Sequence, residues 1–432
     1  MRPIYNGIGF LPGLMCCMFF LLALFSIQLE QWPIDEWLSE NAKWTQISEP
    51  ETARSILGTI AGGIISLTVF SFSMVMVVLN QASSNFSPRL LPGLISDRRN
   101  QSVLGVYLGT IIYCMTLMFN TRAISNNYEV PSLAVLMGVM LMGLCLGLFI
   151  FFIHSISKSI QISEVLEDIY AKTKTYLKEA QKSGTELPSP HKILHHPLLA
   201  PTSGYLQDIR REALIKFCAR HDLLLALHQI QGDFVMEGEI LCYMNRELTD
   251  EKLIDTLQNH FVFYDGEWIA DNYIYGFKHL SEVAVKALSP GINDPATAIS
   301  VLNHLGVLLS KYLSVKEFNP FTDTQNKIRV VIRNHNLEDL LQRTLGPIRF
   351  YGKEDAHVME RLLWLTEKLC THTQDEALQA TLYHFANGVR DSAHEYIPHK
   401  QERDWLNRRF NSMNECLNDA HQLPLLHYLP GD

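Results

Sequence analysis

Four long stretches without a charged side chain dominate the hydrophobic pattern of the N-terminal third of the chain. They lie between Arg2 and Glu30, Arg54 and Arg89, Arg99 and Arg122, and Glu129 and Lys158. A helix of about 20 residues crosses the hydrocarbon core of a bilayer, and each stretch is long enough to do so. The pattern predicts a transmembrane domain over residues 1–158, with helices at about 8–29, 55–79, 102–120 and 131–155.

Beyond this domain the pattern changes to amphipathic helices mixed with short apolar runs. We expect a helical extension and linker over residues 159–198, an α+β domain over 199–325 and a mainly helical region over 326–432. The predicted fold class is a polytopic α-helical membrane protein with an α+β, mostly helical, cytoplasmic domain. Within it, the apolar runs around Gly232 predict a hairpin, and Arg329–Arg333 predicts a short strand. Residues 253–263 and 267–290 predict helices.

The charge distribution sharpens this division. Residues 1–154 carry 15 charged side chains, whereas the other 278 positions carry 66, so the average composition hides a membrane part and a water-exposed part. The net charge of −9 provides no basic surface for nucleic acid, and we expect no nucleic-acid partner. Arginines and lysines gather after the second and fourth stretches. By the positive-inside rule this places both termini in the cytoplasm.

The second stretch carries small and hydroxylated residues on one helical face. It is too long for a single crossing, because its 34 uncharged residues would span about 51 Å as a helix. The face and its polar continuation comprise Gly62, Gly63, Ser66, Phe70, Ser73, Val77, Asn80 and Ser84. Such a face is typical of close packing between helices, and the alternative interpretation is the lining of a pore or gate.

Arg89, Arg98 and Arg99 follow this stretch and have two interpretations. They anchor the chain at the cytoplasmic headgroups, or they form an inner vestibule that attracts anions. In the fourth stretch, the spacing of Gly143 and Gly147 predicts a helix contact. None of the four stretches has an ionisable residue near its centre, which argues against a proton-coupled pump.

Two motifs mark the cytoplasmic domain. The first combines a Ser-Gly-Tyr-Leu segment with a Gly-Asp-Phe-Val segment, and the second is Ala287-Leu-Ser-Pro-Gly-Ile-Asn-Asp-Pro-Ala-Thr-Ala298. Their candidate residues are Ser203, Gly204, Tyr205, Asp208, Gly232, Asp233, Ser289, Pro290, Asn293, Asp294 and Pro295. Asp294 before Pro295 predicts a helix start. The segment is therefore either a structural corner between two helices or a ligand site on free N–H groups.

No cofactor or metal is expected from the sequence. The glycine turns around Gly232 are similar to those of barrel-sandwich modules, but no carrier lysine stands at their tip. His191, His195 and His196 lack a matched cysteine or carboxylate, so an exposed loop is favoured over a metal site. The eight cysteines have no ligand-like spacing and are expected to be free thiols.

Three segments carry a family resemblance. They are Asn80-Gln-Ala-Ser-Ser-Asn-Phe-Ser-Pro-Arg-Leu-Leu91, the pair Ser203-Gly-Tyr-Leu and Gly232-Asp-Phe-Val, and the Ala-Leu-Ser-Pro-x-Ile-Asn-Asp-Pro element. Together they resemble a widespread bacterial family of predicted membrane proteins of unknown function. The resemblance extends over about residues 10–420. It implies four N-terminal spans and a cytoplasmic domain in a bacterial inner membrane, and it supplies no catalytic residues.

These observations support two classes of function. The first is a homo-oligomeric channel for ions or small solutes, gated through its cytoplasmic domain, because a pore lined by one helix requires several copies around an axis. The second is a non-conducting membrane sensor or scaffold whose cytoplasmic domain binds a partner or an unknown small ligand. An enzyme is not expected, because the chain has no metal-ligand set, nucleophile elbow or phosphate loop.

Overall fold

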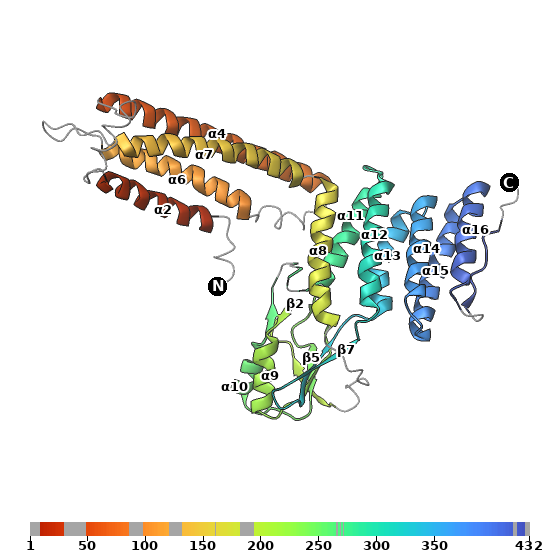
Figure 1. Cartoon of the computed structure of the whole chain (residues 1–432). Coiled ribbons are helices and arrows are strands. Elements are labelled where there is room, and N and C mark those ends of the chain that lie inside the picture. The colour runs from red at the N-terminus through yellow and green to blue at the C-terminus, as the bar shows by residue number, and fades with distance from the viewer. Residues whose placement is uncertain are drawn as a thin grey trace. The chain divides into compact units, whose positions relative to one another are not determined.

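The computed structural model describes residues 9–29, 49–85, 98–120, 132–159, 161–181, 194–264, 267, 269–270, 272–417 and 421–427 (Figure 1). The chain forms two compact units. The membrane unit comprises residues 1–84 and 88–164, and the C-terminal unit comprises residues 85–87 and 165–432.

The membrane unit consists of long apolar helices, as its uncharged stretches predict. They are α2 (Phe10–Leu29), α4 (Pro50–Asn85), α6 (Arg98–Asn120) and α7 (Ser132–Ser159). Within the described residues, these four helices are long and apolar enough to cross a membrane. The largest departure from the predicted ranges is α4, which continues through the polar residues after Val78 and has 36 residues in all.

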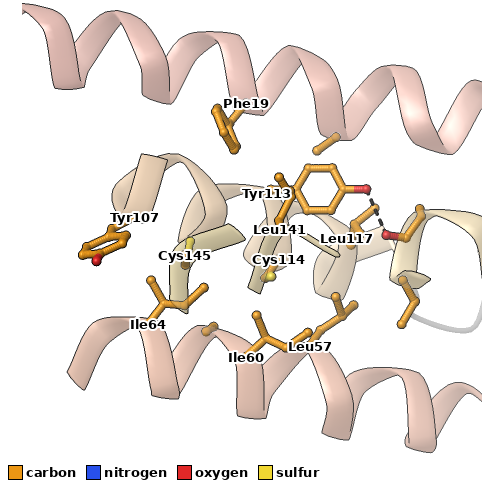
Figure 2. Close-up of a cluster of buried hydrophobic side chains, with 14 of the residues drawn as sticks. Phe19, Leu57, Ile60, Ile64, Tyr107, Tyr113, Cys114, Leu117, Leu141 and Cys145 are labelled. Carbon is orange, nitrogen blue, oxygen red and sulfur yellow. Dashed lines mark hydrogen bonds between the residues drawn. The ribbon is translucent and has the colours of Figure 1, made fainter. Parts of the chain in front are cut away.

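Helix α6 is the central helix of the membrane unit. Half of its spanning segment is buried, against 17% for α4 and 22% for both α2 and α7. Its Tyr113 and Leu117 belong to the same apolar core as Phe19 of α2 and Leu57 and Ile60 of α4 (Figure 2). The Tyr113 hydroxyl donates to the Ala134 carbonyl at 2.9 Å, so this buried polar group is satisfied inside the core.

Two glycines of α6 allow α2 to approach closely. A Cβ at Gly105 would lie 2.5 Å from Met15 Sδ and 3.2 Å from Pro12 Cα. A Cβ at Gly109 would lie 2.7 Å from Phe19 Cγ. Neither position has room for a larger side chain, so the pair forms a glycine-x-x-x-glycine helix contact.

The C-terminal unit begins with a β-rich part. Its strands are β1 (His196–Leu199), β2 (Gly204–Ile209), β3 (Leu225–Leu227), β4 (Phe234–Val235), β5 (Ile240–Met244), β6 (Phe261–Phe263), β7 (Phe318–Thr322) and β8 (Ile328–Arg333). In the described part of the chain, one sheet has the order β1-β5-β3-β8-β7 and the other has the order β4-β2-β6. All pairs are antiparallel except β3 with β8. The two apolar runs that flank Gly232 include β3 and β5, which pair antiparallel, while β4 between them pairs with β2 in the other sheet.

Helices complete the C-terminal unit. They are α8 (Ile162–Gln181), α9 (Arg211–Arg220), α10 (Glu251–Gln258), α11 (Ile274–Ala287), α12 (Pro295–Tyr312), α13 (Leu337–Tyr351), α14 (Ala356–Thr371), α15 (Glu376–Tyr396) and α16 (Lys400–Asn414), with the first residues of α8 assigned to the membrane unit. The helices from α11 onward pack in two layers, in which α12 contacts α14 and α14 contacts α16, while α11 contacts α13 and α13 contacts α15 (Figure 1). The mixed, mostly helical fold confirms the predicted fold class.

Three local predictions need revision. The helix expected over 253–263 ends at Gln258, and Phe261–Phe263 forms β6 against β2 instead, because pairing in a sheet overrides helical periodicity in so short a segment. The helix expected over 267–290 begins only at Ile274 and ends at Ala287. The predicted boundary between residues 325 and 326 falls between β7 and β8, which pair along their length, so both regions share one sheet.

Candidate functional site

The small and hydroxylated face of α4 lies outside the packed core of its own chain. Gly62, Gly63, Ser66, Ser73 and Asn80 are all exposed. A Cβ added at either glycine would meet nothing within 4 Å. The opposite face of the same helix, with Leu57, Ile60 and Ile64, is buried in the core. The chain therefore does not use this face for packing among its own helices.

The larger members of this face are also exposed. Phe70 is 53% exposed and Val77 is 65% exposed, although the Phe70 ring still makes an edge contact with Phe149 of α7 at 5.8 Å between centroids. The Ser66 hydroxyl donates to the Gly62 carbonyl at 3.1 Å within the helix. The Ser66 hydroxyl already has an acceptor within its own helix. The face can therefore contact lipid, water or a neighbouring helix without leaving this hydroxyl unsatisfied.

The remaining predicted members of the membrane site lie at the ends of the described ranges. Ser84 belongs to the last turn of α4, and its side chain is outside the described residues, as are the side chain of Arg98 and all of Arg89. Arg99 is exposed in the first turn of α6. The inner vestibule therefore stays a prediction.

The predicted helix contact at Gly143 and Gly147 is absent from the described chain. Both glycines are exposed, and a Cβ added at either would meet nothing within 4 Å. The close contact occurs instead at Gly105 and Gly109 of α6, where we predicted none. The identical spacing of that pair was a signal that could have revealed it.

In the C-terminal unit, the two segments of the first motif are hydrogen-bonded neighbours. Gly204 and Tyr205 of β2 pair with Val235 and Phe234 of β4. The Ser203 hydroxyl accepts a hydrogen bond from the Glu237 backbone N–H at 2.9 Å and so closes the turn after β4. These contacts explain why the two segments occur together.

Asp208 and Asp233, the acidic members of this motif, accept hydrogen bonds from different parts of the C-terminal unit. The Asp208 carboxylate accepts a hydrogen bond from the Ile209 backbone N–H at 2.8 Å. The Asp233 carboxylate accepts one from Arg343 of α13 at 3.0 Å. The β-rich part and the helical layers are thus joined at Asp233.

The second motif forms the corner between α11 and α12. The Asp294 carboxylate accepts hydrogen bonds from the Thr297 backbone N–H at 3.1 Å and from its hydroxyl at 2.6 Å, and Pro295 begins the helix. The Asn293 N–H donates to the Ser289 carbonyl at 2.9 Å, with Asn293 at a φ of 49°. Pro290 is exposed beside them. Because Asp294 occupies the helix start, the geometry fits a structural corner better than an anion site.

A polar cluster that the sequence pattern did not predict lies where the β-rich part meets the helical layers. The Tyr275 hydroxyl donates to Gln207 Oε1 at 2.5 Å, and Asn272 Nδ2 donates to the Gln231 carbonyl at 2.7 Å. Gly232 has a φ of 101°, and a Cβ there would lie 2.7 Å from Asn272 Nδ2, so only glycine fits. We call Gln207, Gln231, Gly232, Asp233, Asn272, Tyr275, His279, His335 and Arg343 the polar junction.

Several polar atoms of the polar junction are buried without a hydrogen-bond partner among the described residues. They are Gln207 Nε2, His279 Nε2 and His335 Nδ1. His279 Nε2 lies 3.4 Å from a Glu267 carboxylate oxygen, and Lys278 Nζ lies 2.6 Å from the other oxygen. Buried polar groups of this kind are usually satisfied by water or a ligand. No local sequence signal identifies them, because they come from separate segments.

Burial also shifts the acid–base properties of this cluster. It raises the pKa of Tyr275 above its ordinary value, although the hydrogen bond to Gln207 opposes the shift. Burial lowers the pKa of His335, so this imidazole is held neutral, with the nearby Asp233 acting in the opposite direction. The polar junction therefore offers neutral hydrogen-bonding groups.

No metal site stands out in the part of the chain that is described. No group of three or more His, Cys, Asp or Glu side chains there is placed to hold an ion. His195 and His196 stand at the start of β1, and His191 is outside the described residues. All eight cysteines are free thiols.

The comparison with protein families gives one result. Residues 6–368 match the model of the family described as "Predicted membrane protein (DUF2254)". The chain belongs to this family. The match covers all four membrane helices, both sheets and both motifs of the C-terminal unit, which confirms the resemblance seen in the sequence.

Similar curated proteins include uncharacterized proteins of Mycobacterium tuberculosis, strains CDC 1551 and H37Rv, and of Mycobacterium bovis. Each is 26% identical to this chain over 340 residues, which cover 76% of this chain and 65% of the relative. The alignment thus spans somewhat less than two thirds of the relatives' length. No solved structure matches the chain.

Proposed function

We propose that this membrane protein is a homo-oligomeric channel for ions or small solutes, in which α4 lines the pore. The observation that carries the proposal is the exposure of Gly62, Gly63, Ser66, Ser73 and Asn80 on one face of α4. Small and hydroxylated side chains line a pore without closing it, and several copies around an axis would supply its wall. The lipid bilayer of a bacterial inner membrane and further copies of the chain are its partners in this proposal.

The length of α4 supports the same arrangement. Its 36 residues correspond to about 54 Å, which exceeds the roughly 30 Å hydrocarbon core. The polar turns from Asn80 to Asn85 therefore extend past one interface as a helix, where they provide a polar mouth. In this proposal the C-terminal unit lies in the cytoplasm and gates the channel.

Planar-bilayer recording from the purified protein tests the proposal. We expect currents from the wild type and a strong reduction with Ser73→Leu, because a bulky apolar side chain would dewet the pore. Ser73 is exposed in the single chain, so this substitution disturbs no packing within it. The control is Phe72→Leu, which places the same side chain about 100° around the helix at another exposed position. Silent bilayers across voltage and tension would refute the proposal.

A second candidate function rests on the polar junction. Gln207 Nε2 and His335 Nδ1 are buried without a hydrogen-bond partner among the described residues, and they favour a non-conducting sensor whose C-terminal unit binds a small polar molecule. Native mass spectrometry of the purified protein tests this function. A co-purifying small molecule that is lost in Gln207→Leu would support it, and the same spectra report the number of copies in the assembly.

A further inference from the structure

Helix α8 connects the last membrane span to the C-terminal unit. It begins at Ile162, three residues after α7 ends at Ser159, and from Val165 onward it belongs to the C-terminal unit. One face of α8 is buried over about three turns. That face consists of Leu166, Ile169, Thr173 and Leu177, each at most 5% exposed. The spacing of these residues is that of an amphipathic helix docked on a core.

The closest contact of α8 is with a glycine of α11. A Cβ at Gly276 would lie 2.7 Å from Thr173 Cβ and 2.8 Å from its methyl group. The Thr173 hydroxyl donates to the Ile169 carbonyl at 2.6 Å, and the side chain is fully buried. Because Thr173 is short, branched at Cβ and held in place, it cannot move aside for a larger residue at position 276.

Polar contacts with α12 fix both ends of the docked segment. Near its start, Glu167 lies 3.4 Å from His304 Nε2, and the Tyr170 ring packs edge-on against the same imidazole. At its end, Gln181 Nε2 donates to the Lys311 carbonyl at 2.5 Å. This amide thereby satisfies one of the carbonyls that the end of α12 leaves free. Contacts at the start, middle and end of the docked segment thus fix the position of α8 along α11 and α12.

We propose that α8 is the coupling element of the protein: its docking on α11 and α12 holds the cytoplasmic end of span α7, so that movement in the C-terminal unit is transmitted to the membrane helices. Only two positions of the sequence separate α7 from α8. The Gln161 N–H donates to the Lys158 carbonyl at 3.0 Å, and Lys158 Nζ lies 3.5 Å from Glu164 Oε1. This inference assigns a regulatory route to the proposed channel and rests on that function for its gating role.

Hydrogen exchange of the full-length protein in lipid nanodiscs tests the coupling. We expect Gly276→Ala to force α8 from α11 and to raise amide exchange across residues 165–181 by about tenfold or more. If α8 holds the end of α7, exchange across residues 152–159 also rises. The double variant Thr173→Gly with Gly276→Ala moves the small residue from one helix to the other and restores both rates. A matched control is Gly346→Ala in α13, where a Cβ would meet only the end of the flexible Gln342 side chain at 3.3 Å.

The outcomes are distinguishable. Faster exchange in α8 with an unchanged rate in residues 152–159 would overturn the coupling, and so would an unchanged rate in both. Where currents are measured, we expect Gly276→Ala to change the open probability and to leave the unitary conductance unaltered. If no variant conducts, the channel proposal fails, whereas the exchange data still decide whether α8 couples the two parts of the chain.

Discussion

The two units of this protein differ in which groups they expose and which they bury. The membrane unit buries apolar side chains between its helices and leaves Gly62, Ser66 and Ser73 of α4 on the outside. The C-terminal unit turns polar groups inward, at the polar junction and at Arg403, which is fully buried. The C-terminal unit thus places polar groups in its interior, whereas the membrane unit presents small and hydroxylated residues on a surface that can contact lipid, water or another copy.

Helix termini show the same contrast. In the C-terminal unit, α10, α12, α13, α14 and α15 all begin at an Asp or Asn side chain that accepts a backbone N–H. Helices in water need such caps because their first N–H groups have no partner within the helix. The positions of the described membrane helices instead follow the uncharged segments of the sequence. We therefore expect each unit to be stabilised mainly by its own contacts, so that a substitution away from α8 lowers the stability of its own unit far more than that of the other.

The largest effect is expected at Arg403. Its guanidinium donates to the carbonyls of Ile397 at 2.6 Å and His394 at 2.9 Å, and to that of His427. We expect Arg403→Ala to destabilise the C-terminal unit by about 3 kcal/mol or more, since three carbonyls lose their donor in a buried site. Urea unfolding followed by hydrogen exchange of peptides from each unit measures the loss. Arg403→Lys should be intermediate, and an equal shift in the membrane unit would contradict independent stabilisation.

A smaller effect is expected in the membrane unit at Gly109. Gly109→Ala would place a Cβ against the Phe19 ring, and we expect it to destabilise the contact between α2 and α6 by about 1–3 kcal/mol. Amide hydrogen exchange of α2 peptides, with the protein in nanodiscs, measures this loss of stability. Gly143→Ala is the control, because a Cβ there meets nothing. If the control loosens α2 equally, the packing assigned to α6 is wrong.

Substitutions at the corner between α11 and α12 should destabilise the protein less than Arg403→Ala or Gly109→Ala. We expect Asp294→Ala to lower the stability of the C-terminal unit by about 1 kcal/mol, because Thr297 loses its cap. Thermal denaturation followed by circular dichroism would report the loss. Asn293→Gly should cost nothing, since glycine adopts positive φ readily. An Asp294→Ala protein with wild-type stability would argue against the structural corner.

The smallest expected effect is a pH dependence of the stability of the C-terminal unit that arises from His335. Burial lowers its pKa in the folded protein, so below the ordinary value of about 6.5 the unfolded chain takes up a proton that the folded chain does not. Stability should therefore fall as the pH drops from about 6.5 towards the lowered folded pKa. The midpoint of urea unfolding of the C-terminal unit, compared at pH 8 and pH 6, measures the loss. In His335→Gln this part of the dependence should vanish, and an identical slope in both proteins would exclude His335 as its source.

The sequence predicted those parts of the fold that depend on local pattern. Uncharged stretches located the four spans because crossing a bilayer excludes charge over a fixed length. Asp294 and Pro295 located the start of α12, since capping depends on a few adjacent residues. The pairing of β3 with β5 followed from two neighbouring apolar runs.

Other features depended on residues far apart in the chain. Residues 261–263 form a strand only because β2 lies beside them, and the polar junction exists only because separate segments meet. For the candidate site, the sequence identified the small face of α4 but left open whether the chain packs it. Tertiary structure decided that Gly105 and Gly109 face a partner helix while Gly62, Gly63, Gly143 and Gly147 do not. The physical reason is that glycine spacing records only where a close approach is possible, and the surface of a second helix determines where it occurs.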